Sequence, residues 1–433
     1  MQRVSGYADG ETDDRSVVFL HVGAPKTGTT FLQTVLWKNR EALREDGVLY
    51  PGHLFAAHLH AAFDLRRAGF HGYADPYVPG AWDRIVDEAR DWRGTVIISQ
   101  EAFSPATRDQ IAQAMAALSF AEVHLIYTAR DLVRQIPAVW QEEIKNRFTL
   151  GFSDLIETLR APTEERHPLG TMFWRTQDAV EVLDRWAHDL PPERVHVVTV
   201  PAQGSSSGLL WQRFAGVVGL DTDRYDTTSA ASNPSLGAAE ADLLRRVNIA
   251  LEESIPWPVY NTYVKHFLGQ EVLAGRPDPV KITLSAETHD WVVGRSAELV
   301  DGLKGAGYDI VGDLAELIPG PSTATPGGPT FEDIPAELQL SAAVDGMVGL
   351  IQRIARLPDP HGPLPEWVRH LEEELARRKR QPARSLIRDI SERNRAVMRA
   401  RAAWWHSVER ARRLRAWLGR RAGSDTATHR VGQ

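Results

Sequence analysis

The chain has 433 residues, of which 43% are hydrophobic and 25% charged, a composition typical of globular proteins and long enough for two ordinary domains. It contains no cysteine, which excludes disulfides, thiolate metal sites and a cysteine nucleophile. The net charge is −7, but residues 377–421 hold 16 Lys and Arg against 3 Asp and Glu. The rest of the chain is therefore acidic, and we expect no nucleic-acid partner.

Strands and helices alternate through the first half of the chain. Residues 16–22 are apolar and rich in β-branched residues, which predicts a buried strand, and a glycine loop and a helix over residues 29–39 follow it. This succession predicts an α/β fold of the P-loop-like kind, a parallel sheet flanked by helices. The further predicted strands are 95–99, 123–128 and 195–200, and the further predicted helices are 81–91, 108–118, 132–147 and 179–189.

The second half of the chain reads as mainly helical. Residues 238–252 and 286–304 are the clearest helices, and residues 319–329 have the proline- and glycine-rich composition of a linker. Beyond the linker, helices are predicted at residues 340–357 and 366–419. The expected organisation is a flexible N-terminus (1–15), an α/β domain (16–318), a linker (319–339) and a helical, basic C-terminal extension (340–433).

The basic tail permits two interpretations. Trp404, Trp405 and Leu414 lie among its arginines, a pattern that can place a helix on an anionic membrane surface. The alternative is a solvated helical hairpin that packs on itself or on a second subunit. The N-terminus is acidic and polar, and no run of about 18 apolar residues occurs. We therefore expect a cytoplasmic protein, with peripheral membrane contact as one of the two options for the tail.

The segment Gly23-Ala-Pro-Lys-Thr-Gly-Thr-Thr30 joins the first strand to the first helix. A helix N-terminus offers unpaired N–H groups, Gly28 allows a ligand to approach the backbone, and Lys26 adds a point charge. These residues predict a phosphate-type anion cradle, although a plain strand-to-helix turn would use some of them too. In a Walker A loop the lysine follows the second glycine, whereas Lys26 precedes Gly28, which disfavours an ordinary ATPase or kinase.

Two segments carry a resemblance to a known family. The glycine loop with Phe31-Leu-Gln33 resembles the 5′-phosphosulfate loop of sulfotransferases that use 3′-phosphoadenosine-5′-phosphosulfate (PAPS). Tyr127-Thr-Ala-Arg-Asp-Leu-Val-Arg-Gln135 resembles the turn that holds the donor's 3′-phosphate in that family. The resemblance spans about residues 16–318. It is closest in character to bacterial sulfotransferases that have segments like Tyr50-Pro-Gly and Val139-Trp-Gln-Glu142.

The resemblance implies roles for individual residues. Lys26 matches the lysine that contacts the phosphosulfate bridge and the leaving oxygen, and Arg130 matches the arginine on the 3′-phosphate. The family usually has a serine where this chain has Ala138, so Arg134 or Gln135 is expected to replace that contact. The rest of the donor cradle matches Thr27, Gly28, Thr29 and Thr30.

The reaction also requires a base within reach of the acceptor hydroxyl. His58, and more weakly His60, lie at a distance after Lys26 where many carbohydrate sulfotransferases have a catalytic glutamate. Glu101 follows the strand at residues 95–99, near the position of the catalytic histidine in cytosolic sulfotransferases. Of these we rank His58 ahead of Glu101, although each could be structural. The spacing of His58 and His60 does not favour a metal site.

The function expected from this resemblance is transfer of a sulfuryl group from PAPS to a hydroxyl, with no metal. The acceptor would be a carbohydrate, a glycolipid or another small metabolite. Two alternatives stay open: a P-loop phosphotransferase or kinase, and a non-catalytic nucleotide-binding or membrane-associated scaffold.

Overall fold

The computed structural model describes residues 15–202, 204–206, 208–228, 235–322 and 333–357. The chain divides into two compact units, Met1–Gln352 and Arg353–Gln433, and nearly all described residues belong to the first. The flexible N-terminus expected for residues 1–15 lies outside the described residues except for Arg15. The helix expected at residues 366–419, with the tail tryptophans, also lies outside them.

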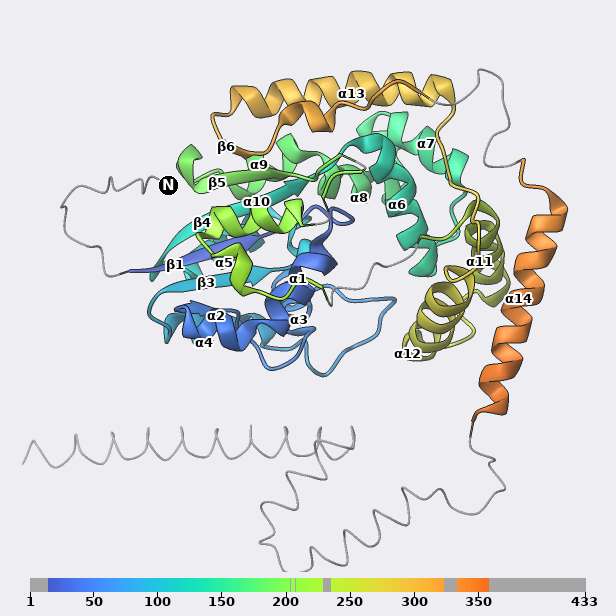
Figure 1. Cartoon of the computed structure of the whole chain (residues 1–433), viewed down its shortest axis with the longest axis horizontal. Helices are drawn as coiled ribbons and strands as arrows, with labels where there is room; N and C mark the ends of the chain where they lie inside the picture. The colour runs from blue at the N-terminus through green and yellow to red at the C-terminus, as the bar shows by residue number, and fades with distance from the viewer. Residues whose placement is uncertain (1–14, 203, 207, 229–234, 323–332, 358–433) are drawn as a thin grey trace, which may run out of the picture. The chain divides into compact units, whose positions relative to one another are not determined.

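A six-stranded sheet forms the centre of the first unit (Figure 1). Its order is β2-β3-β1-β4-β5-β6, and every neighbouring pair is parallel. This confirms the predicted fold class. The two edge strands, β2 and β6, were not predicted because two or three residues are too few to show a period. The strands are β1 (Ser16–His21), β2 (Val48–Leu49), β3 (Thr95–Ser99), β4 (Ala121–Ala129), β5 (Val195–Thr199) and β6 (Asp309–Val311).

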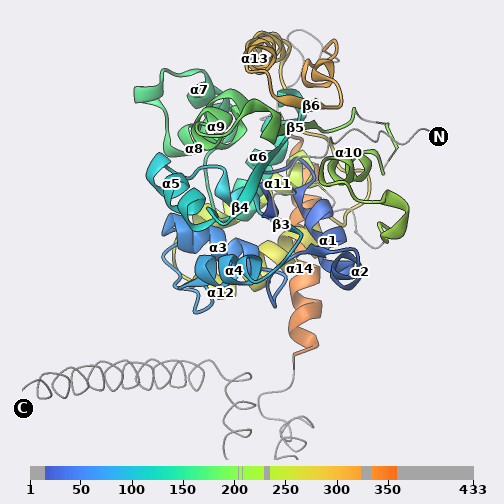
Figure 2. The same cartoon turned by 90° about the vertical axis from the view of Figure 1, so that its left-hand side faces the viewer.

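Successive residues of each strand point to opposite faces of the sheet, and both faces are buried under helices (Figure 2). Val18 and Leu20 of β1 belong to one core, and Phe19 belongs to the other. The first core includes α3 (Ala57–Arg66), α4 (Ala81–Arg90), α5 (Arg108–Ala117) and α9 (Ala179–Trp186), and the second includes α1 (Thr29–Lys38), α2 (Arg40–Glu45) and α10 (Leu209–Val218).

A third core is formed by helices and the loops between them, without strand residues. Most helices of this core that were predicted from the sequence begin and end within three residues of the predicted bounds. One segment, η5 (Asn261–Leu273), is a π-helix; its i→i+5 hydrogen bonds do not follow the 3.6-residue period by which helices are recognised in sequences. The other helices of this core are α6 (Leu132–Lys145), α7 (Phe152–Arg160), α8 (Pro168–Gln177), α11 (Ala238–Leu251), α12 (Trp257–Tyr260) and α13 (Ala286–Gly305).

The helix α14 (Ala336–Ala355) begins inside the stretch assigned to the linker. It packs on η5 through small residues: a Cβ on Gly349 would lie 2.7 Å from Val272, and one on Gly346 would lie 3.3 Å from Leu268. Among the described residues, no helix is long and apolar enough to cross a membrane.

Candidate functional site

The chain changes direction across the sheet between β1 and β4. After β1 the connection runs towards β2 at one edge, and after β4 it runs towards β5 on the other side. Ligands of open parallel sheets bind beyond the carboxyl ends of the strands at such a switch point. Lys26 lies in the loop after β1 and Arg130 directly follows β4. Their segments touch, because the Nη1 atom of Arg130 donates a 2.9 Å hydrogen bond to the Lys26 carbonyl oxygen.

The loop after β1 leaves the N-terminus of α1 open. Gly28 precedes the helix with φ 87°, and a Cβ there would overlap the Leu210 side chain, so this position requires glycine. Among the described residues, no side chain caps α1, and its first turn contains no acidic residue. An uncapped first turn leaves N–H groups without a partner inside the helix, and such groups can bind an anion.

The hydroxyl of Thr27 lies beneath the loop. Thr27 is 1% exposed, and its Oγ1 donates to the Ala24 carbonyl at 2.5 Å and lies 2.5 Å from Thr128 Oγ1. The Thr27 hydroxyl therefore stabilises the loop from its buried side. This position differs from the ligand-binding role that was expected for the hydroxyl. Thr29 and Thr30 do line the cavity described below.

Three ammonium groups meet one carboxylate beside the loop; we name Lys26, Lys145, Lys265 and Glu142 the lysine cluster. Glu142 Oε2 lies 3.1 Å from Lys26 Nζ and 2.8 Å from Lys145 Nζ, and its Oε1 lies 3.0 Å from Lys265 Nζ. Burial by itself would raise the pKa of Glu142, but the three lysines hold it well below its usual range. Glu142 is therefore ionised at neutral pH.

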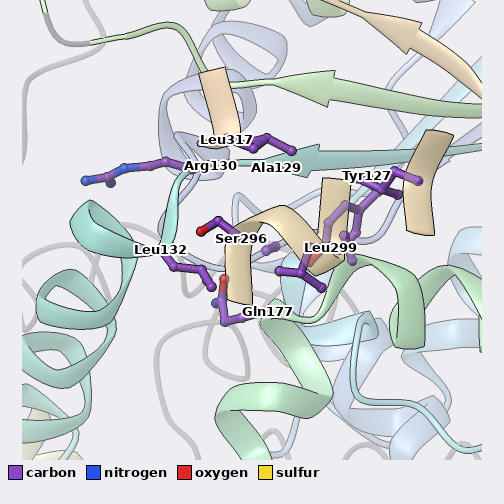
Figure 3. A pocket seen from close by; sticks show the side chains of 11 residues that line it. Tyr127, Ala129, Arg130, Leu132, Gln177, Ser296, Leu299 and Leu317 are labelled. Carbon is purple, nitrogen blue, oxygen red and sulfur yellow. The ribbon is translucent and has the colours of Figure 1, made fainter. Parts of the chain in front are cut away.

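Arg130 is held between the loop and α6. Its Nη2 donates to the Arg134 carbonyl at 3.1 Å, whereas its buried Nε has no hydrogen-bond partner among the described residues. Burial lowers the pKa of Arg130 to about 10, with a smaller contribution from Arg134, so the guanidinium stays charged at neutral pH. Figure 3 shows the side chain directed away from Tyr127 and Leu299, which line a small cavity of about 20 Å³ at its base.

The two expected replacements for the family serine have other partners. Arg134 forms an ion pair with Asp131 and donates to the Pro201 carbonyl at 3.2 Å. Gln135 is fully buried and donates to the Pro25 carbonyl and to Gln177. Asp131 also caps α6 by accepting from the Arg134 backbone N–H. Gln135 thus supports the loop from below, and Arg134 fixes the start of α6.

The structure keeps His58 away from the cavity. The residue is 3% exposed. Its Nε2 donates to the Pro51 carbonyl at 2.8 Å, and its Nδ1 accepts from the Ser99 backbone N–H at 3.1 Å. Burial lowers the pKa of His58 to about 4. Both ring nitrogens are therefore engaged with the backbone, which is the arrangement of a residue that ties α3 to the end of β3.

His60 and His53 contact residues outside the glycine loop, and neither lines the cavity that borders Lys26. His60 stacks on Tyr77, with ring centroids 5.7 Å apart, and its Nε2 lies 3.9 Å from Asp75. His53 is an exposed residue near Glu88. Within the described ranges, no group of three or more His, Asp or Glu side chains could hold a metal ion.

Glu101 does lie in the cavity. It follows β3 in a short helical turn that Gln100 caps, and its Oε2 accepts a 2.8 Å hydrogen bond from Gln33 of α1. A Cβ on Gly23 would lie 3.3 Å from the Glu101 Cβ, so the backbones of the two loops are close. Of the residues proposed from the sequence as a base, Glu101 is the one that borders the same cavity as Lys26.

The cavity has a volume of about 1360 Å³, more than the roughly 300–1,000 Å³ of most small-molecule sites. One end is formed by the loop, with Lys26, Gly28, Thr29 and Thr30, and by Thr228. The cavity is also lined by the charged residues Arg66, Glu101, Glu142, Glu143, Lys145 and Lys265. The apolar wall contains Phe63, Phe70, Val139, Trp140, Phe148, Leu155, Leu169, Met172 and Phe173.

Comparisons with known proteins find little similarity. No family model matches the chain, and a search of curated proteins finds no match. Among solved structures, the crystal structure of a sulfotransferase from Alicyclobacillus acidocaldarius is similar, with 15% identity and a TM-score of 0.40. The match covers 69% of this chain and 97% of that one. So distant a similarity does not bear on activity, which has to be argued from the site.

Proposed function

We propose that this chain transfers a sulfuryl group from PAPS to a hydroxyl acceptor. The observation that carries the proposal is the contact between two cationic residues 104 positions apart, Lys26 and Arg130, at the switch point of the sheet. A donor with a 3′-phosphate and a 5′-phosphosulfate on one ribose requires two neighbouring anion sites. The loop after β1 and the turn after β4 would serve as these two sites.

The residues present fit such a donor. The uncapped N-terminus of α1, with Gly28 before it, can hold a phosphosulfate against the backbone N–H groups. Arg130, charged and with its Nε unpartnered among the described residues, can hold a 3′-phosphate. When bound, the donor would supply the sulfuryl group and a phosphate leaving group.

Each charged residue around the loop then has a distinct task. Lys26 would turn from Glu142 towards the leaving oxygen, where negative charge develops. Glu101 would take the proton of the acceptor hydroxyl as that oxygen bonds to sulfur. The fixed loop and the wall of the cavity would hold the reacting groups in line. Acceptors such as carbohydrates, glycolipids and small metabolites fall within this scheme.

Calorimetry with adenosine 3′,5′-bisphosphate, AMP and ATP tests the proposal. We expect the bisphosphate to bind about tenfold or more tightly than AMP, because AMP has no group for Arg130. Tighter binding of ATP would instead favour a phosphotransferase. A chain that binds the bisphosphate but transfers no label from radiolabelled PAPS to any acceptor class would favour a non-catalytic scaffold.

A further inference from the structure

The lysine cluster contains more positive than negative charge. Three lysines surround the single carboxylate of Glu142, and the side chains of Lys145 and Lys265 are only 9% and 14% exposed. If Lys26 serves the donor, two ammonium groups still face one carboxylate. Excess charge of one sign in a largely buried group is unfavourable, so the cluster is suited to receive one further anionic group.

The neighbouring acidic residue does not pair with these lysines. Glu143 follows Glu142 on α6 and lines the same cavity. Burial, reinforced by the charge of Glu142, raises the pKa of Glu143 to about 7. No hydrogen bond or ion pair joins the Glu143 carboxylate to any of the three lysines, whereas Glu142 contacts all of them.

The charge excess adjoins an aromatic wall. Lys265 Nζ lies 2.6 Å from Asn146 Oδ1 and 5.9 Å from the centroid of the Phe70 ring. Phe70 in turn packs on Phe63, with centroids 5.0 Å apart, and stacks on Trp257. An anion at Lys265 would therefore have apolar surface directly beside it.

We infer that the acceptor is an amphiphilic anion, a molecule that joins an apolar body to a carboxylate, sulfate or phosphate, with Lys265 and Lys145 binding the anionic group. This inference rests on the proposed function for the word acceptor, but the binding site itself does not. The apolar body lies along Phe63, Phe70 and Phe173, in a cavity of about 1360 Å³ that the glycine loop also lines.

Two fluorescent probes separate the charge from the apolar body. 8-Anilinonaphthalene-1-sulfonate and N-phenyl-1-naphthylamine share their aromatic rings and differ in the sulfonate. We expect the full-length protein to bind the sulfonate at least about tenfold more tightly, from one charge-assisted contact. Saturating adenosine 3′,5′-bisphosphate should leave this preference in place, because it occupies the other end of the cavity.

Variants locate the preference. Lys265→Met should lower the affinity for the sulfonate probe about tenfold and leave the uncharged probe unchanged, whereas Lys265→Arg should keep the preference. Lys304→Met, at an exposed lysine on α13, is the matched control and should change neither affinity. Circular dichroism shows whether each variant is folded.

Three outcomes overturn the inference: equal affinities of the two probes, loss of the preference with bisphosphate bound, or a folded Lys265→Met variant that keeps it. Failure of the proposed function has a different signature. In that case the bisphosphate does not bind, while the preference for the sulfonate probe and its dependence on Lys265 persist.

Discussion

The glycine loop and the lysine cluster lie side by side, but the chain assembles them in different ways. The loop is one contiguous segment whose shape depends on backbone geometry, with Gly28 in the left-handed region and Thr27 bonded beneath it. The cluster joins a loop, α6 and η5 through long side chains that meet at Glu142. Contiguity leaves a motif in the sequence, whereas the cluster leaves none. The glycine loop can therefore be predicted from the sequence, and the lysine cluster cannot.

The largest expected effect on turnover is at Glu101, which lies outside the lysine cluster. Glu101→Gln should lower turnover by about 10²–10⁴-fold, the usual contribution of a general base, with the affinity for adenosine 3′,5′-bisphosphate unchanged. Turnover with labelled PAPS and calorimetry measure the two quantities. Glu41→Gln, at an exposed residue on α2, is the control.

The opposite result would indicate that the general base is a residue beside the lysine cluster. If Glu101→Gln is active and Glu143→Gln is not, Glu143 takes the role. Since burial raises the pKa of Glu143 to about 7, the activity should then be lost as the pH falls through that value, because a base has to be deprotonated to act.

Lys26 belongs to both the glycine loop and the lysine cluster. Its replacement tests whether it serves turnover or only binding. Lys26→Ala should lower turnover by about 10²–10³-fold, as when one donor to a developing negative charge is removed. Affinity for the bisphosphate product should fall much less, and Lys26→Arg should restore only part of the activity. Lys304→Ala serves as the control. A variant with equal losses in turnover and product affinity would show that Lys26 only binds.

A smaller effect is expected at Arg130. Arg130→Ala should reduce the preference for adenosine 3′,5′-bisphosphate over AMP by about tenfold, the value of one charge-assisted hydrogen bond. The affinity for AMP serves as the internal control, because it reports any disturbance of the loop through the lost bond to the Lys26 carbonyl. An unchanged ratio in calorimetry would remove Arg130 from the 3′-phosphate site.

The smallest effect on activity is expected at His58, which lies in neither region. Its pKa, lowered by burial to about 4, is below that of an unfolded histidine, about 6.5. As the pH falls, the unfolded chain takes up the proton first, so the stabilisation present above 6.5 is lost towards pH 4. His58→Gln should keep turnover at pH 7.5. Between pH 7.5 and pH 5, its melting temperature should fall less than that of the wild-type protein. Equal falls in the melting temperatures of the variant and the wild type would contradict this.

How far the sequence predicts the site depends on the distance between its parts. Lys26 and Gly28 were predicted from the loop after the first strand, and Arg130 was predicted from the family resemblance; in the structure Arg130 contacts the Lys26 carbonyl. Glu142 was noted only as part of a family-like segment, and Lys145 stands three residues after it. Lys265 had no local signal, because η5 lacks the α-helical period. The spacing of His58 from Lys26 placed it ahead of Glu101 in the sequence analysis. Spacing does not reveal which side of α3 is buried, and His58 lies on the buried side.

The π-helix has a consequence for how this site could be lost. Its 13 residues from Asn261 to Leu273 wind more widely than an α-helix. If the same residues wound as an α-helix, each would turn further around the axis, and Lys265 would face another direction relative to α12. The ammonium group would then leave Glu142 although every charged residue of the cavity remained. Here the winding of a helix specifies the position of a charge as strictly as the identity of the side chain does.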